Sequence, residues 1–297
     1  MAGLTDRETR QVEQANASGR TPVVFIHGLW LLPSSWDNWA GFFEDAGYAA
    51  VTPSWPDDPE TVAEARAHPE VFAGKTLGEV ADHTAAVIGG LDKKPAVMGH
   101  STGGLLAQII ADRGLSAVTV AIDPGPFRGV LPLPLSTLRS SSPVLRNPLN
   151  RGRAVALTPG QFKYGWANAL DDEETERLYE TYHVPTPGVA LMQMAYANLN
   201  PRTEAKLDPK NPDRGPLLII EGEKDHTVAM AIAKASFKRQ LQNPAVTEFE
   251  TVPNRGHSLT IDSGWREVAE KALVFVKRFA GPTASRDPQP QPEKSLS

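Results

Sequence analysis

The sequence predicts an α/β fold, in which a mostly parallel sheet flanked by helices carries a helical cap insertion. Short apolar runs alternate with segments of helical periodicity along most of the chain. The runs are apolar throughout, which is typical of strands that are buried on both faces of a parallel sheet. This alternation breaks between residues 127 and 212. We therefore expect a core of residues 21–126 and 213–280, interrupted by a cap at 127–212.

The expected elements of the core follow one another in a regular order. The strands are expected at 22–28, 49–54, 95–100, 117–123, 217–225 and 246–253, and most of them are short apolar runs. The helices are expected at 34–48, 76–91, 105–114, 227–241 and 264–280. Thr76, with Glu79 three residues later, has the capping-box spacing of a helix start.

The cap and the two ends of the chain differ from the core in composition. The cap opens with prolines and serines and then becomes helical and aromatic. Residues 1–20 and 281–297 are polar, with too little apolar surface to offset the entropy of ordering them. We expect a loose N-terminal arm at 1–20 and a disordered tail at 281–297.

Composition excludes several classes of function. The formal net charge of −5 argues against nucleic acid or an anionic membrane surface as a partner. There is no cysteine, which excludes disulfides, thiolate nucleophiles and cysteine-ligated zinc. No apolar run approaches the roughly 20 residues of a membrane span, and the N-terminus has no signal-peptide character. We expect a cytoplasmic protein with no membrane span, and its oligomeric state stays open.

The strongest functional signal is the sequence GHSTG at 99–103, between an expected strand and an expected helix. A serine hydroxyl acts as a nucleophile only beside a base and near hydrogen-bond donors. A sharp strand-to-helix turn can hold it there, and the crowding of that turn requires small residues two before and two after the serine. We interpret Ser101 as the nucleophile. The alternative is a glycine-rich loop whose serine only caps the helix.

A second signal is the pair His27 and Gly28 at the end of the first expected strand. Strand ends of this kind share the edge of a parallel sheet at which ligands bind. A tight turn there can aim the backbone N–H of Leu29 at the site, and Thr102 begins the helix after Ser101. We expect these two N–H groups to form an oxyanion hole. His27 itself is expected to be a buried structural residue.

The base and the orienting acid are expected from later strand ends. Of the seven histidines, His257 follows the last strand and precedes the last helix, so it is the expected base. The alternative is a surface histidine that caps the helix. The chain order of a serine, an acid and a histidine fits both Asp225 and Asp123. Asp225 lies in a loop with slack to reach the imidazole and fix its tautomer, so it is preferred, and Asp123 is expected to be structural.

Taken together, the motifs resemble the α/β-hydrolase superfamily, especially its capped group of esterases, lipases and cofactor-free perhydrolases or haloperoxidases. The motifs are HGLW at 27–30, GHSTGG at 99–104, GEKDHTV at 222–228 and RGHS at 255–258. The resemblance covers about residues 21–280 and implies Ser101, Asp225 and His257 as the catalytic triad. It also implies Leu29 and Thr102 as the oxyanion donors.

Two features depart from that family pattern. The usual opening strand pair is shortened or missing, and residues 52–75 lack the basic, glycine-rich loop that many relatives have. No metal-binding or nucleotide-binding motif is present, so we expect no metal and no cofactor.

The expected reaction is the cleavage of a small-molecule carboxylic ester through an acyl-enzyme on Ser101. The same residues would serve a perhydrolase or haloperoxidase, in which peroxide replaces water. A non-catalytic, ligand-binding member of the fold is the third hypothesis, although such members usually lack a triad residue. In the cap, aromatic and methionine side chains would line a pocket or simply hold the cap to the core, whereas Trp30 is better placed to face the pocket.

Overall fold

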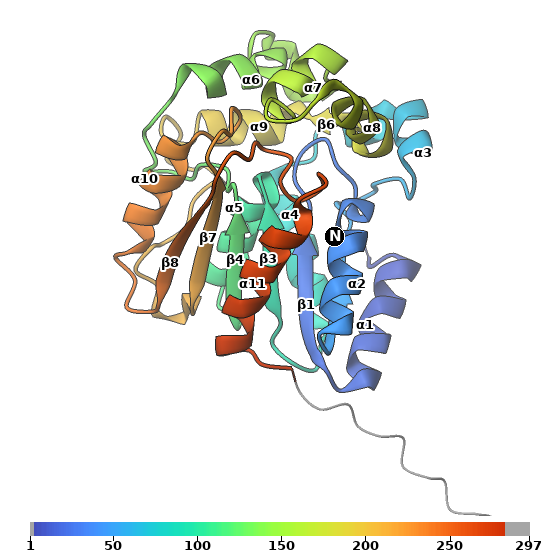
Figure 1. The fold of residues 1–297 in the computed structure, drawn as a ribbon, viewed down its shortest axis with the longest axis vertical. Helices are drawn as coiled ribbons and strands as arrows, with labels where there is room; N and C mark the ends of the chain where they lie inside the picture. The colour runs from blue at the N-terminus through green and yellow to red at the C-terminus, as the bar shows by residue number, and fades with distance from the viewer. Residues whose placement is uncertain (1–2, 283–297) are drawn as a thin grey trace, which may run out of the picture.

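The computed structural model describes residues 3–282 and contains a six-stranded sheet. The strand order is β2-β1-β3-β4-β7-β8, and every neighbouring pair is parallel (Figure 1). The strands are β1 (Thr21–Ile26), β2 (Tyr48–Val51), β3 (Ala96–His100), β4 (Val118–Ile122), β7 (Leu217–Gly222) and β8 (Thr247–Val252). The predicted fold class is therefore confirmed, with β1 as the first strand of the sheet.

Helices cover both faces of the sheet because alternate strand residues point to opposite sides. The helices of the core are α1 (Asp6–Ser18), α2 (Asp37–Asp45), α3 (Val62–Ala67), α4 (Leu77–Gly89), α5 (Thr102–Asp112), α10 (Met230–Gln240) and α11 (Trp265–Phe279). Val23 and Phe25 pack with the apolar side chains of α2 and α11, whereas Val24 and Ile26 pack with those of α4 and α5. Helix α4 begins with the predicted capping box of Thr76 and Glu79.

The N-terminal segment differs from its prediction as a loose arm, because residues 6–18 form α1. Thr5 and Glu8 make a capping box at the start of α1, and Val12 and Ala15 are buried against the core. The Glu8 carboxylate also accepts a hydrogen bond from His83 on α4 at 2.9 Å. Polar composition was misleading here, because a few apolar and buried polar contacts are enough to fix the helix. The predicted tail lies outside the described residues from residue 283 onward.

The segment between β4 and β7 lies over the edge of the sheet at which the strands end (Figure 1). Its elements are α6 (Leu135–Leu145), β5 (Ala154–Val155), α7 (Pro159–Gly165), α8 (Asp172–Tyr182), β6 (Thr186–Pro187) and α9 (Gly188–Ala195). We keep the name cap for this segment. Among the described residues, no helix is long and apolar enough to cross a bilayer.

Candidate active site

Ser101 stands on a strained turn between β3 and α5. Its backbone adopts φ 57° and ψ −120°, a left-handed conformation that is rare for a residue with a side chain. A Cβ on Gly99 would collide with the backbone of Gly103, and one on Gly103 would collide with the backbone of Ile26. The small residues predicted on either side of the serine are therefore required by close backbone approach. The turn presents the serine at the cavity beneath the cap.

The structure brings the three expected residues of the triad together from three strand ends. Ser101 Oγ lies 2.9 Å from His257 Nε2, and His257 Nδ1 lies 2.6 Å from Asp225 Oδ2. The other oxygen of Asp225 accepts hydrogen bonds from the backbone N–H groups of Thr227 at 2.6 Å and Val228 at 2.9 Å. Because an ionised carboxylate can only accept, Nδ1 carries the imidazole proton and Nε2 is free to accept one from the serine.

Burial sets the charge state of the imidazole. His257 is fully buried, and burial lowers its pKa below the ordinary value because the charged form loses its hydration. The imidazole is therefore neutral in the resting protein, as a general base must be. The ring is also held by its neighbours, since the indole of Trp166 from the cap packs edge-on against it at 4.7 Å between centroids.

Behind the imidazole lies a buried cluster of three carboxyl groups, from Asp123, Glu221 and Asp225. One oxygen from each lies within 4.8 Å of the others. Asp123 Oδ2 is 3.8 Å from His257 Nδ1, and Asp123 Oδ1 accepts a hydrogen bond from the N–H of Gly222 at 2.7 Å. Asp123 was expected to be structural. Its Oδ2 lies 1.2 Å farther from His257 Nδ1 than Asp225 Oδ2 does, so the hydrogen-bond partner of the imidazole is Asp225.

The three carboxyl groups cannot all be ionised in so small a buried volume. Burial, followed by the charge of Asp225, raises the pKa of Asp123 well above its usual range. Burial, followed by the charges of Asp123 and Asp225, does the same to Glu221. Burial also raises the pKa of Asp225, but its two backbone N–H donors act against this. Three hydrogen-bond donors, the imidazole and two backbone N–H groups, favour the negative charge on Asp225, whereas burial favours the protonated forms of Asp123 and Glu221.

A cation could use the same oxygens only at the expense of these contacts. Both oxygens of Asp225 already accept hydrogen bonds, one of them from the imidazole. A metal ion needs carboxylate oxygens that are free to bind it, so this cluster is better suited to holding protons than to holding a metal ion.

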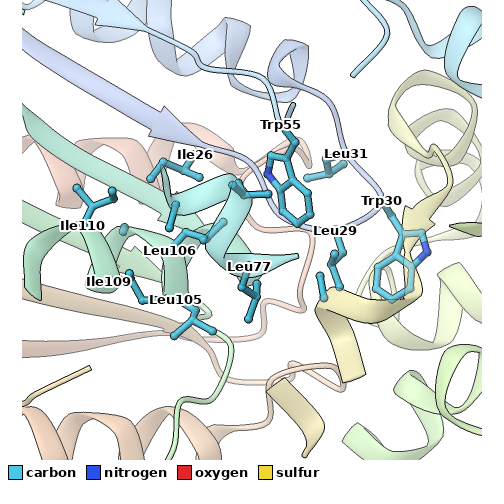
Figure 2. Close-up of a cluster of buried hydrophobic side chains, with 14 of the residues drawn as sticks. Ile26, Leu29, Trp30, Leu31, Trp55, Leu77, Leu105, Leu106, Ile109 and Ile110 are labelled. Atoms are coloured by element: carbon cyan, nitrogen blue, oxygen red, sulfur yellow. The ribbon is translucent and has the colours of Figure 1, made fainter. Parts of the chain in front are cut away.

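The two backbone N–H groups expected in the oxyanion hole flank Ser101. A Cβ on Gly28 would lie 2.9 Å from the Cβ of Ser101 and 3.5 Å from the nitrogen of Thr102, so the turn that carries Leu29 is pressed against the serine. Neither Leu29 nor Thr102 donates a backbone hydrogen bond to another group within residues 3–282. Figure 2 shows Leu29 within a buried cluster that also includes Trp30, Leu77 and Leu105, and this cluster anchors the turn.

His27 precedes that turn and is buried, in agreement with its prediction as a buried structural residue. Its Nε2 lies 3.3 Å from a carboxylate oxygen of Asp58, whose other oxygen accepts a hydrogen bond from Lys75 at 2.8 Å. The ring also stacks on Trp55 at 5.5 Å between centroids. The contact with Asp58 and the stack on Trp55 fix the end of β1, from which Gly28 and Leu29 follow.

Two residues that hold the site were not found from the sequence. His100 Nε2 donates a hydrogen bond to the backbone carbonyl of His257 at 2.8 Å, which ties the histidine loop to β3. Trp166 packs on the rings of both His100 and His257, and its carbonyl accepts the N–H of Ser258 at 3.1 Å. His100 stood in the GHSTG motif, but only the fold shows which loop it contacts. Trp166 carried no local signal beyond the aromatic character of the cap.

A cavity of about 320 Å³ leads from Ser101 to the surface beneath the cap. Most of its lining is apolar, and the lining includes Leu29, Trp30, Ser101 and Thr102. Met194 of α9 closes one side, because its sulfur lies 3.7 Å from the Thr102 hydroxyl oxygen. Trp30 lines the cavity as predicted, and its indole N–H donates to the carbonyl of Val155 at 3.0 Å.

Solved structures of similar fold include several ester-cleaving enzymes. The monoacylglycerol lipase of Paleococcus ferrophilus has a TM-score of 0.60 and 17% identity, over 88% of this chain and 98% of its own. An esterase from Thermogutta terrifontis has a TM-score of 0.60 and 20% identity, over 87% of this chain and 90% of its own. A methylesterase from Arabidopsis has a TM-score of 0.58 and 14% identity, over 87% of this chain and 99% of its own. At these identities the likeness concerns the fold.

Sequence comparison supplies the family. No curated protein matches the chain. The model of a family described as the alpha/beta hydrolase family matches residues 23–271, which include the strained serine turn, the histidine loop and the whole cap. The chain therefore belongs to the alpha/beta hydrolase family.

Proposed function

We propose that this protein is a carboxylic ester hydrolase with Ser101 as nucleophile, His257 as general base and Asp225 as the orienting acid. The observation that carries the proposal is the continuous hydrogen-bonded chain from the Ser101 hydroxyl through the imidazole to the Asp225 carboxylate. Two further features support it: the unused N–H groups beside the serine and an apolar cavity that ends there.

The acylation step follows from this geometry. Ser101 Oγ attacks the carbonyl carbon of the ester while His257 Nε2 takes the hydroxyl proton. The carbonyl oxygen becomes an oxyanion and accepts hydrogen bonds from the N–H groups of Leu29 and Thr102, each worth about 2.7–4 kcal/mol in the transition state. The tetrahedral intermediate then collapses, the C–O bond to the alcohol breaks, and the imidazolium returns its proton to the leaving alkoxide.

Deacylation repeats the sequence with water. His257 removes a proton from a water molecule, the hydroxide attacks the acyl carbon, and the same two N–H groups bind the second oxyanion. Collapse releases the carboxylic acid and restores the Ser101 hydroxyl. Asp225 stays ionised throughout and stabilises the imidazolium that forms in both steps.

The cavity indicates the class of ester. Its walls near the serine are apolar and contain no charged side chain, so they favour an apolar acyl or alcohol group over a charged one. We therefore propose esters with an aliphatic or aromatic chain as substrates.

A fluorophosphonate labelling experiment tests the assignment. The reagent should add one adduct, mapped by peptide mass spectrometry to Ser101, and should abolish hydrolysis of p-nitrophenyl butyrate. Ser101→Ala should take no label and lose about 10⁶-fold in kcat. Ser136→Ala, on α6 and outside the cavity lining, is the matched control and should label as the natural chain does. An unlabelled, folded natural chain, or full turnover by Ser101→Ala, would overturn the proposal.

A further inference from the structure

The mouth of the cavity is built from exposed leucines. Leu131, Leu133, Leu138 and Leu199 line the cavity that reaches Ser101 and also stand in solvent. The exposed fractions of Leu131, Leu133 and Leu199 are 75%, 61% and 81%. We call these four residues the leucine rim. Leu135, at the start of α6, is 83% exposed and extends the same surface beside the mouth.

The sequence LPLPL at 131–135 explains why these leucines remain outside. Exposure alternates along it, with each leucine exposed and each intervening proline partly buried. Residues two apart in an extended segment lie on one side, and proline locks the backbone dihedral φ near −65°. The segment therefore cannot turn the leucines inward. An exposed apolar group of this size usually marks a surface that contacts another apolar phase.

The same part of the chain is basic. Residues 124–170 contain five arginines, one lysine and no aspartate or glutamate, although the whole chain has a formal net charge of −5. Within the described residues, no carboxylate lies within 4 Å of Arg128, Arg139 or Arg146. Outside this segment, six arginines pair with acids: Arg66, Arg113, Arg177, Arg255, Arg266 and Arg278.

Arg128 contacts the segment that carries Leu199, and Arg139 and Arg146 directly follow Leu138 and Leu145, which line the cavity. Arg128 donates a hydrogen bond to the carbonyl of Pro201 at 3.2 Å, two residues from Leu199. Arg139 follows Leu138 on α6 and is exposed, with its guanidinium 3.9 Å above the ring of Tyr164. The acidic first turn of α8 lies at the other end of the cap from the segment that leads into α6 (Figure 1). The exposed leucines at 131–135 thus lie apart from the acidic turn of the cap.

We propose that the leucine rim, Leu135, and the guanidinium groups of Arg128, Arg139 and Arg146 dock this face of the cap onto an anionic phospholipid surface. The leucines would enter the acyl region and the arginines would contact the headgroups. The three arginines without a carboxylate partner distinguish between the possible binding partners of this face. A neutral apolar partner would leave them unmatched, and a two-fold dimer through this face would bring like charges together. Net charge, averaged over the chain, had argued against such a surface, but the local charge is positive.

Docking would join the bilayer to the cavity. An apolar ester could then pass from the lipid to Ser101 without crossing water, because the leucines that touch the membrane also line the cavity. This consequence rests on the proposed hydrolase function, whereas the docking itself does not.

Co-sedimentation with vesicles tests the docking. The full chain carrying Ser101→Ala is used, so that lipids are not cleaved. It should bind vesicles that contain phosphatidylglycerol much more strongly than vesicles of phosphatidylcholine alone, and binding should weaken as salt rises from 50 to 500 mM. Each arginine near an anionic surface contributes about fivefold, so the triple variant Arg128→Gln, Arg139→Gln, Arg146→Gln should bind on the order of 100-fold more weakly.

Matched variants separate the docking face from the rest of the surface. Leu131→Ser, Leu133→Ser and Leu135→Ser together should lower binding by on the order of 100-fold or more. Leu241→Ser and Arg10→Gln replace an exposed leucine and an exposed arginine outside the cap and should bind as the parent does. Thermal unfolding of each variant checks that it is folded.

Several results would overturn the proposal. The first is the absence of binding, and the second is equal binding to both kinds of vesicle. The third is binding that the cap variants leave unchanged. The fourth is a dimer of the parent chain in sedimentation analysis that becomes a monomer in the leucine variants. Fluorophosphonate labelling of the natural chain is independent of every one of these outcomes, so a failure of docking is distinguishable from a failure of the hydrolase assignment.

Discussion

At the floor of the cavity, Ser101, His257 and Asp225 are buried and hydrogen-bonded to one another, whereas the mouth of the same cavity exposes leucines and arginines to water. The floor is a set of polar groups in a place where apolar ones would be more stable. The mouth is a set of apolar groups in a place where polar ones would be more stable. Both arrangements work against stability, which is a common sign that a surface serves function.

The difference teaches how each region is maintained. The floor depends on exact hydrogen-bond geometry, and a change of one atom there should have a large effect on rate. The mouth depends on the total apolar area and charge, so single changes should have small effects on stability and activity in water. The following predictions test this contrast, from the largest expected effect to the smallest.

Replacing each of the two aspartates near the imidazole by asparagine, one at a time, should separate their roles. Asp225→Asn would lose the carboxylate that fixes the His257 tautomer, and we expect kcat for p-nitrophenyl butyrate to fall by about 10⁴-fold. Asp123→Asn should stay within about tenfold of the natural chain, because an asparagine can still accept the Gly222 N–H and is neutral, as a protonated aspartate is. Steady-state kinetics of the two variants, with circular dichroism as a folding control, would measure the difference.

An equal loss in both variants would contradict this account. It would mean that both carboxylates must be ionised, or that Asp123 exchanges roles with Asp225. Asp123→Ala is a useful companion, because it removes the hydrogen-bond partner of Gly222 and should reduce stability more than Asp123→Asn does.

The strands and the serine turn could be predicted from the sequence because their signals are local. In an α/β chain, a continuous apolar run predicts a buried strand. A glycine two residues before and another two residues after Ser101 predict a tight turn from strand to helix. His257 and Asp225 could be predicted because each follows a strand of the same sheet. The contact between Asp123 and the imidazole could not, since it depends on the register between β4 and β7.

Helix α1 marks the limit of composition as a guide. The spacing of Thr5 and Glu8 carried a capping-box signal, but the segment is polar overall. Its order comes from partners far along the chain, such as His83, which lies 75 residues from Glu8. Contacts of this range are invisible in a local pattern. The exposure of the leucines in the cap was equally hidden, because an apolar residue in a sequence is expected to be buried.

The buried carboxyl cluster also predicts a dependence of stability on pH. The pKa of Glu221 is raised in the folded chain, so its contribution to stability is fully present below the ordinary value near 4.5 and is lost as pH rises above it. The loss amounts to about 1.4 kcal/mol for each pH unit over which the unfolded carboxyl is ionised and the folded one is not. Glu221→Gln removes this titration, so its free energy of unfolding should increase relative to the natural chain between pH 5 and pH 8. Urea unfolding at both values measures the change, and a difference that is constant with pH would contradict a proton on Glu221.

The smallest effect is expected at the mouth. Leu135 is 83% exposed and packs on little, so Leu135→Ser should change the free energy of unfolding by less than about 0.5 kcal/mol. Leu106→Ala is the matched comparison, because Leu106 is fully buried on α5, the helix that follows Ser101, and its truncation should cost about 2–5 kcal/mol. Urea unfolding of both variants measures the pair. A cost for Leu135→Ser close to that of Leu106→Ala would mean that the leucine is packed in solution, and a packed leucine has no side chain left to offer to a lipid surface.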